Sequence, residues 1–262
     1  MCLLVLAWRS HGRYRLVAAA NRDEYHARAS APLAAWTDAP GIVGGRDLQA
    51  LGAWFAVDPQ RRFGIVTNFR EFGRSRRSAP SRGALIPAYL SGPAAPGAYL
   101  ASLEVDAPGY AGFNLLLGDG DSLWYASNRA DRFARELPAG VYGLSNEFLD
   151  TPWPKLVRVR ERLAGLLADP AMEDRRPLAA ALFAALADRE PAPPESLRNS
   201  DLSPEWARKL SAPFVLDPGY GTRCSTVLTV THDGELAMTE RRFDAQGIQT
   251  GETEYALNAT GP

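Results

Sequence analysis

Cysteine is almost absent from this chain, which has only Cys2 and Cys224 among its 262 residues. Two cysteines cannot build a disulfide framework, and 3 histidines spread along the chain form no zinc-binding spacing. We therefore predict neither a metal nor a cofactor. An excess of one charge is also lacking, because 29 lysine and arginine residues, almost all of them arginine, stand against 30 acidic residues. No overall field favours nucleic acid or an anionic membrane, so neither is a predicted partner.

Long hydrophobic runs are missing too. The chain opens on a short apolar run, Leu3–Trp8, whereas a membrane-spanning helix needs roughly 20 such residues. A signal peptide would place a basic region before the run and a cleavage site after it. A buried strand is the better interpretation, and we expect a cytoplasmic protein without a membrane span.

The pattern of strands indicates a layered fold. With 46% hydrophobic residues the chain can bury a substantial core, and we expect one domain spanning 1–262. Leu3–Ser10 and Arg13–Asn21 predict a hairpin whose first strand is apolar on both faces, as in a strand that is covered on both sides. Further strands are predicted at Gly52–Val57, Arg62–Asn68, Gly112–Gly118, Ser122–Asn128, Val141–Leu144, Cys224–Thr231, Glu235–Phe243 and Glu252–Leu257.

Helices are expected mainly in the middle of the chain. Leucine and valine at helical spacing predict helices within Thr151–Ala187, beginning at Thr151-Pro152 and again at Pro177. Shorter helices are predicted at Gly83–Leu90, at Ala98–Glu104 and after Ser203, and the polar segment Arg70–Arg82 reads as a surface loop. Strands at both ends with helices between them indicate two sheets with helices packed outside.

The register of the first hairpin bears on function. If His11 and Gly12 form a two-residue turn, Cys2 lies opposite Asn21. The polar run Asn21-Arg22-Asp23-Glu24 then lies beside Cys2. A three-residue loop would shift this register by one position.

Cys2 can combine two chemical roles. Because cysteine is small, removal of Met1 is expected, and this exposes an α-amine with an ordinary pKa of about 7.7–8.0. Such an amine can act as general base for the thiol of the same residue. Asp23 could orient the amine, and Arg22 could favour the thiolate. The alternative interpretation is a small buried cysteine beside a polar turn.

Several blocks of sequence together resemble one family. Met1-Cys2, an apolar strand and Asn21-Arg22-Asp23-Glu24 are similar to the start of the NRDE family, which includes the transport and Golgi organisation protein 2 homologues. The resemblance continues, in the family's order, through Gly52-Ala53-Trp54-Phe55, Val66-Thr67-Asn68-Phe69-Arg70, Gly112-Phe113-Asn114-Leu115-Leu116, Tyr142-Gly143-Leu144-Ser145-Asn146, Thr151-Pro152-Trp153-Pro154-Lys155 and Tyr220-Gly221-Thr222-Arg223-Cys224-Ser225-Thr226. It covers essentially the whole chain.

These blocks also resemble the cysteine branch of the N-terminal-nucleophile (Ntn) hydrolases, which includes bile salt hydrolases and penicillin V acylases. That resemblance implies an α+β fold, a four-layer αββα sandwich of two mainly antiparallel sheets with helices outside. It implies the following roles: Cys2 as nucleophile, Asp23 as orienting carboxylate, Asn146 as oxyanion donor, Arg223 as a late active-site arginine and Asn68 as a substrate contact. We add Arg22 as a catalytic candidate beside the thiol, and Asn21 and Asn114 as candidate substrate contacts.

Some positions depart from the pattern or have simpler interpretations. The acylases carry an arginine three residues before the aspartate, where this chain has Ala20. Arg22 could replace it but points to the other face of a strand. Asn114 also fits a core hydrogen-bonding residue, Arg223 an ion-pair partner and Cys224 a small buried residue.

Two functions follow from these residues. The first is an Ntn-type cysteine hydrolase that cleaves a non-peptide C–N amide bond of a small N-acyl substrate. The second is a non-catalytic carrier or trafficking protein for a small hydrophobic ligand such as haem or a lipid. In both cases the partner is a small molecule, since fold alone does not fix function.

Overall fold

The computed structural model describes residues 2–71, 79–197 and 202–259. Met1, whose removal is predicted, and most of the predicted loop Arg70–Arg82 lie outside these residues. The chain folds into two compact units. The first unit contains 1–27, 139–145 and 149–262, and the second contains 28–138 and 146–148. The prediction of a single domain stays a prediction.

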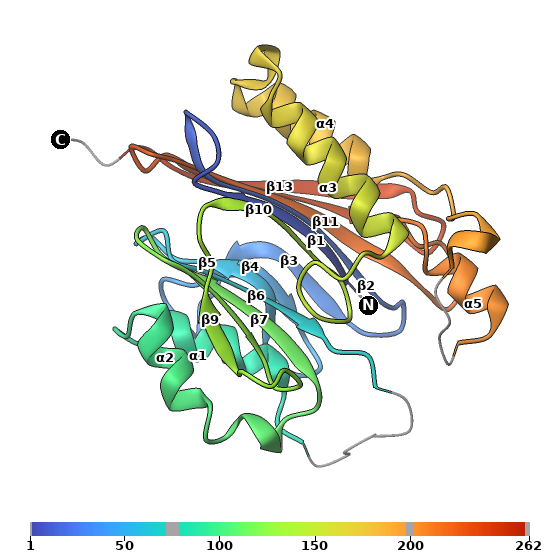
Figure 1. Cartoon of the computed structure of the whole chain (residues 1–262). Coiled ribbons are helices and arrows are strands. Elements are labelled where there is room, and N and C mark those ends of the chain that lie inside the picture. The colour runs from blue at the N-terminus through green and yellow to red at the C-terminus, as the bar shows by residue number, and fades with distance from the viewer. Residues whose placement is uncertain (1, 72–78, 198–201, 260–262) are drawn as a thin grey trace. The chain divides into compact units, whose positions relative to one another are not determined.

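The first unit is built on a six-stranded antiparallel sheet with the order β10-β1-β2-β11-β12-β13. Its strands are β1 (Cys2–Trp8), β2 (Tyr14–Tyr25), β10 (Gly140–Leu144), β11 (Tyr220–Thr231), β12 (Leu236–Phe243) and β13 (Gln249–Leu257). The two chain-terminal parts thus share one sheet, as Figure 1 shows. A tight turn joins β11 to β12, and Gly234 in this turn has a positive φ of 88°.

Helices α3 (Pro154–Leu167) and α4 (Arg175–Leu186) pack on one face of this sheet (Figure 1). Leu156, Val159 and Leu163 of α3 share a buried cluster with Leu3 and alternate residues of β1 and β2. The predicted helix start at Thr151-Pro152 is wrong by two residues, because Trp153 is the N-cap and Pro154 takes the first helical position. The second helix begins at Arg175 rather than at Pro177. The short helix α5 (Pro204–Lys209) begins as predicted, with Ser203 accepting a hydrogen bond from Trp206 N.

The second unit is built on a seven-stranded antiparallel sheet, β3 to β9 in chain order. The strands are β3 (Ser30–Ala35), β4 (Val43–Asp47), β5 (Ala53–Val57), β6 (Phe63–Asn68), β7 (Phe113–Gly118), β8 (Leu123–Ser127) and β9 (Ala134–Glu136). Helices α1 (Leu85–Ser91) and α2 (Pro96–Leu103) pack on it, and their leucines share one buried cluster with β5 to β8. The α+β class with two antiparallel sheets and packed helices is confirmed.

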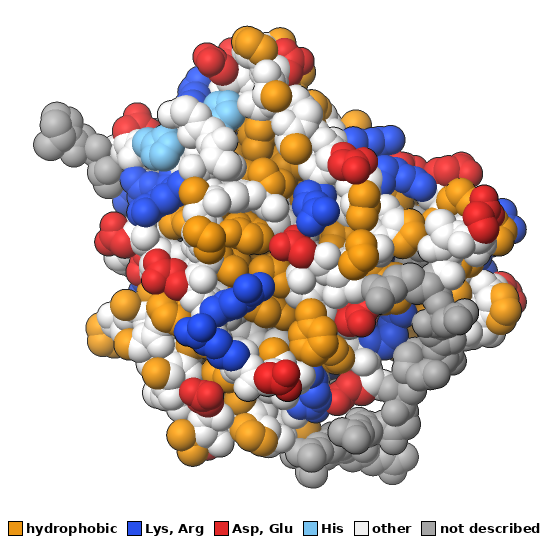
Figure 2. All heavy atoms as spheres, in the orientation of Figure 1, with side chains coloured by type: hydrophobic (Ala, Val, Ile, Leu, Met, Phe, Trp, Pro, Cys, Tyr) orange, Lys and Arg blue, Asp and Glu red, His pale blue; other side chains and the backbone are white. Residues whose placement is uncertain are grey.

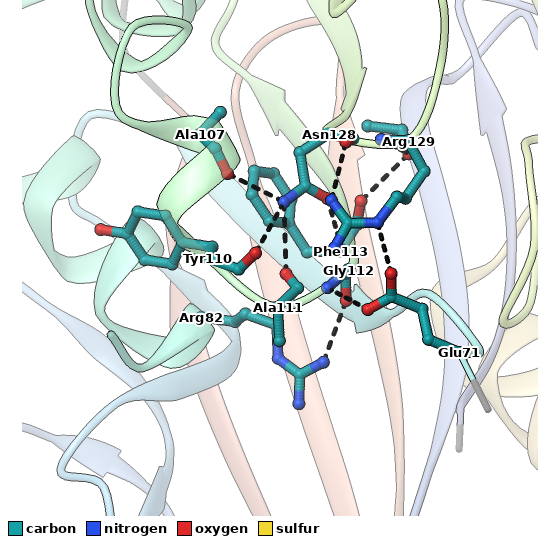
Figure 3. Close-up of polar contacts among 10 residues, drawn as sticks. Glu71, Arg82, Ala107, Tyr110, Ala111, Gly112, Phe113, Asn128 and Arg129 are labelled. Carbon is teal, nitrogen blue, oxygen red and sulfur yellow. Dashed lines mark hydrogen bonds and ion pairs between the residues drawn. The ribbon is translucent and has the colours of Figure 1, made fainter. Parts of the chain in front are cut away.

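A polar cluster fixes the turn that leads into β7, as Figure 3 shows. Glu71 accepts hydrogen bonds from Gly112 N at 2.9 Å and from Arg129 Nε at 2.5 Å. Arg82 donates to Gly112 O at 2.9 Å. Asn128 accepts from Phe113 N at 2.8 Å. Side chains therefore bind both the N–H and the C=O of Gly112. These hydrogen bonds hold the backbone in place directly before β7.

Charges are interspersed on the surface. Figure 2 shows acidic and basic side chains mixed over the visible face, without a large field of either sign. This agrees with the formal net charge of −1. Among the helices of the described residues, none combines the length and the apolar character that crossing a bilayer requires.

Candidate functional site

The register of the first hairpin differs from the prediction by one residue. Cys2 pairs with Arg22, and Leu3 pairs with Asn21. The reason is the turn: β1 ends at Trp8 and β2 begins at Tyr14, so the loop is longer than two residues. Arg9 has a positive φ of 46°, and the ring Nδ1 of His11 accepts from the backbone N of Arg13 and Tyr14. The correction leaves Cys2 directly across from the Asn-Arg-Asp-Glu run.

Asn21 ties several elements of the first unit together. Its side chain is 1% exposed. Nδ2 donates to Leu186 O at the end of α4 and to Pro213 O, both at 2.9 Å. Ser225 of β11 donates to its Oδ1 at 2.6 Å. These bonds give Asn21 a structural role, and its predicted contact with a substrate stays a prediction.

Asp23 is a buried carboxylate at the end of β2, with 1% of its surface exposed. Thr222 of β11 donates to its Oδ1 at 2.7 Å, and Thr222 Oγ1 in turn accepts from Val215 N at 2.9 Å. Burial raises the pKa of Asp23, while the positive charge of Lys155, the hydrogen bond from Thr222 and the charge of Arg22 act in the opposite direction. The site therefore combines a desolvated carboxylate with cations that favour its ionised form.

Arg22 lies between Asn21 and Asp23 and is only 6% exposed. Because side chains alternate along a strand, it lies on the opposite face of the sheet from its two neighbours. Its Nη2 lies 4.0 Å from Glu24 Oε2. Arg22 is thus a buried guanidinium in the ladder position across from Cys2.

Arg223 occupies a β-bulge. The register between β2 and β11 shifts between Thr222 and Cys224, which leaves Arg223 as the extra residue. Bulges of this kind redirect a side chain. Here Nη1 of Arg223 donates to Tyr25 O at 3.0 Å and to His26 O at 3.1 Å. Burial, together with the charge of Arg22, lowers the pKa of Arg223.

The two cysteines belong to β1 and β11, which are separated by β2. Cys2 and Cys224 both pair with Arg22, one from each side. Strands are spaced about 4.8 Å apart, so two strand spacings put their Cα atoms about 10 Å apart, beyond the span of a disulfide. The Cys224 side chain is buried, as predicted, with 4% of its surface exposed.

The three remaining predicted residues lie in the second unit. Asn146 donates from Nδ2 to Asn68 O at 2.8 Å, so these two residues are neighbours. Asn114 of β7 is fully buried and donates to Glu147 O at 2.9 Å, while Tyr125 donates to its Oδ1 at 2.8 Å. The core hydrogen-bonding interpretation of Asn114 agrees with these contacts. Cys2, Arg22, Asp23 and Arg223 belong to the first unit. The role of Asn146 as an oxyanion donor for Cys2 stays a prediction.

Lys155 is the site residue that sequence reasoning missed. It is the second residue of α3 and is only 3% exposed. Its charge acts on Asp23. A signal was present in the sequence, because Lys155 is one of only two lysines in a chain whose cations are almost all arginine.

The fold and the site together define an α+β protein whose first strand begins at a cysteine in position two, beside a buried aspartate. A family model described as Transport and Golgi organisation 2 matches residues 1–245. The chain belongs to this family, which confirms the resemblance seen in the sequence.

Named relatives agree with the family. The chain is 32% identical over 264 residues to a Transport and Golgi organization protein 2 homolog of Bos taurus and 30% identical to that of Homo sapiens, in each case covering 95% of both chains. It is 24% identical to Transport and Golgi organization protein 2 of Drosophila melanogaster, covering 92% of this chain and 91% of the relative. Among solved structures, a Caenorhabditis elegans ortholog of N-acylethanolamine-hydrolyzing acid amidase gives a TM-score of 0.49 at 12% identity, covering 87% of this chain and 92% of the other.

Proposed function

We propose that this chain is an Ntn-type cysteine hydrolase that cleaves the C–N amide bond of a small, non-peptide N-acyl substrate. Removal of Met1 makes Cys2 the N-terminal residue. The observation that supports this most strongly is the start of β1 at Cys2, in register with Arg22 and beside the buried carboxylate of Asp23.

The chemistry follows from having an amine and a thiol on one residue. The α-amine takes the thiol proton, and the thiolate attacks the substrate carbonyl carbon. The C–N bond then breaks, and the leaving nitrogen takes the proton from the ammonium. Water, deprotonated by the same amine, attacks the thioester. The carboxylic acid leaves, and the sulfur recovers a proton.

Residues of the first unit have defined roles in this proposal. Asp23 orients the α-amine, and Arg22, across the ladder from Cys2, favours the thiolate. Arg223 holds the backbone that follows Asp23, through Tyr25 O and His26 O. The resemblance adds Asn146 as oxyanion donor, a role typically worth about 3 kcal/mol of transition-state stabilisation.

A matched pair of cysteine variants tests the proposal. Hydrolysis is measured on a series of N-acyl p-nitroanilides of increasing chain length. We expect Cys2→Ala to lower kcat/KM by about 1,000-fold or more, because it removes the nucleophile. The control Cys224→Ala should stay within about threefold of the wild type, since Cys224 takes no part in the chemistry.

Two results would contradict the proposal. One is hydrolysis by Cys2→Ala at the wild-type rate. The other is saturable binding of the N-acyl probes with neither release of p-nitroaniline nor an acyl adduct on the protein. The second result would favour the carrier of a small hydrophobic ligand.

A further inference from the structure

The chain contains only two lysines, Lys155 and Lys209, among its 29 basic residues. Lys209 is partly exposed and forms ion pairs with Glu205 at 2.9 Å and with Asp217 at 2.8 Å. Lys155, in contrast, is 3% exposed. A lysine is almost never fully buried unless a group of opposite charge compensates it.

The position of Lys155 in its helix is also unfavourable for a positive charge. It is the second residue of α3, and the first turn of this helix contains no acidic residue. The helix dipole places partial positive charge at this end, so a cation here is disfavoured. Helix formation and core packing would both be served better by an apolar residue. The helix dipole therefore does not explain why this position carries a positive charge.

The fold places Lys155 and Asp23 on one face of the first sheet. Leu156, the next residue, packs against Gly143 of β10, where an added Cβ would come within 2.7 Å of Leu156 Cδ1. Gly143 pairs with Val5 of β1. The start of α3 thus lies over the early part of β1. Asn21 reaches Leu186 of α4 on this same face, and strand alternation puts Asp23 there too.

We propose that Lys155 is a positioning residue whose ammonium group balances the buried Asp23 carboxylate, so that Asp23 can hold the α-amine of Cys2 in place. This role rests on the proposed hydrolase function. A carboxylate alone would hold the amine as its ammonium form and so impair it as a base. A carboxylate already balanced by Lys155 can accept a hydrogen bond from the amine and leave it neutral. The charge of Lys155 acts to lower the pKa of Asp23. This effect and the burial of both side chains agree with the arrangement.

Other charged groups near Asp23 have different tasks. Arg22 also favours the ionised form of Asp23, but it lies on the opposite face of the sheet. Arg223 of β11 donates to the carbonyls of Tyr25 and His26. Thr222 supplies a neutral hydrogen bond to Asp23. Lys155 is the residue of α3 whose positive charge acts on Asp23.

The direct test is the titration of Asp23 in the full-length protein. Carbon-13 labelling of aspartate side chains allows each carboxyl group to be followed by NMR, and the signal lost in Asp23→Asn identifies Asp23. Lys155→Met should move the midpoint of Asp23 upward by at least about one pH unit, a tenfold change in its ionisation. Lys155→Arg, which keeps the charge, should stay close to the wild type.

Controls separate the charge of Lys155 from its packing. Lys209→Met, which removes the other lysine, should leave the Asp23 midpoint unchanged. If Lys155→Met does not fold, Lys155→Gln removes the charge while keeping a polar side chain, and the same upward shift is expected. An Asp23 midpoint in both neutral variants equal to that of the wild type would overturn the proposal.

Kinetics distinguish this proposal from the function on which it rests. The acidic limb of the kcat/KM profile should move to higher pH in Lys155→Met and return in Lys155→Arg, whereas a merely structural lysine would not move it. If Cys2→Ala still hydrolyses the substrate, the hydrolase proposal fails, and the Asp23 titration still reports on the charge pair. If Cys2→Ala is inactive but Lys155→Met keeps the wild-type profile, only the role of Lys155 fails.

Discussion

The four residues of the run Asn21-Arg22-Asp23-Glu24 do different things, although in the sequence they form one polar block. Asn21 and Asp23 are buried on the side of α3 and α4, and Arg22 is buried on the other face of the sheet. Glu24 lies near Arg22. The sequence supports the prediction that this run matters. The sequence alone does not show which residues of the run stabilise the fold and which belong to the chemistry. That distinction depends on hydrogen-bond partners as distant in sequence as Leu186 and Thr222.

Asp23 should make the stability of the protein depend on pH. Burial raises its pKa above the ordinary value of 3.8, so the folded chain binds the proton more tightly than the unfolded chain. The stability that Asp23 contributes is full below the unfolded pKa and is lost as the pH rises through the folded pKa. The Tm of the wild type minus that of Asp23→Asn should therefore decrease between pH 4 and pH 8.

The comparison needs a surface control. Asp121→Asn, at an exposed position, should give a Tm difference that varies little over the same pH range. A Tm difference for Asp23→Asn that grows as the pH rises would show that folding lowers the pKa of Asp23 instead of raising it.

Asn21 is the residue of the run with the clearest structural cost. Asn21→Ala removes three hydrogen bonds and leaves buried partners at Leu186, Pro213 and Ser225. We expect a loss of about 2–4 kcal/mol in the free energy of unfolding, measured by urea denaturation. A loss below about 0.5 kcal/mol would contradict the role assigned to this side chain.

At the scale of elements, periodicity predicts most strands but not their exact pairing. The register of β1 and β2 was predicted one residue away from that observed, since it depended on a turn whose length the sequence does not state. The prediction omitted β3, β4 and β9. β4 contains two glycines, and at Gly44 a Cβ would lie 2.7 Å from Ala56 Cβ. Glycine there permits close approach of β5, a requirement that strand propensity does not record.

The Gly112 turn offers a test at this scale. Glu71→Ala removes the acceptor of Gly112 N and the partner of Arg129. Because both groups are at least half-buried, we expect a loss of about 1–3 kcal/mol in the free energy of unfolding. The exposed Glu161→Ala should change stability by less than about 0.5 kcal/mol. Equal effects of the two variants would contradict the role of the cluster seen in Figure 3.

At the scale of the whole molecule, family and fold class followed from blocks of sequence that keep their order along the chain. The matched relatives are animal proteins, and the alignments to those of Bos taurus and Homo sapiens cover 95% of this chain. Lys155 was missed because the role proposed for it depends on the carboxylate of Asp23, which lies on β2 and is distant in the sequence. Asn146 lies in the second unit, so its assigned role depends on the resemblance alone.

The central claim is that Cys2 acts as an N-terminal nucleophile, and intact-mass spectrometry with peptide mapping tests it most directly. The protein, produced in a host that processes N-termini normally, is analysed before and after brief treatment with iodoacetamide. We predict a mass without Met1 and an adduct that forms first on Cys2, because thiolate fraction and exposure set the rate and Cys224 is 4% exposed. Quantitative retention of Met1, or labelling of Cys224 as fast as Cys2 in the folded protein, would contradict it.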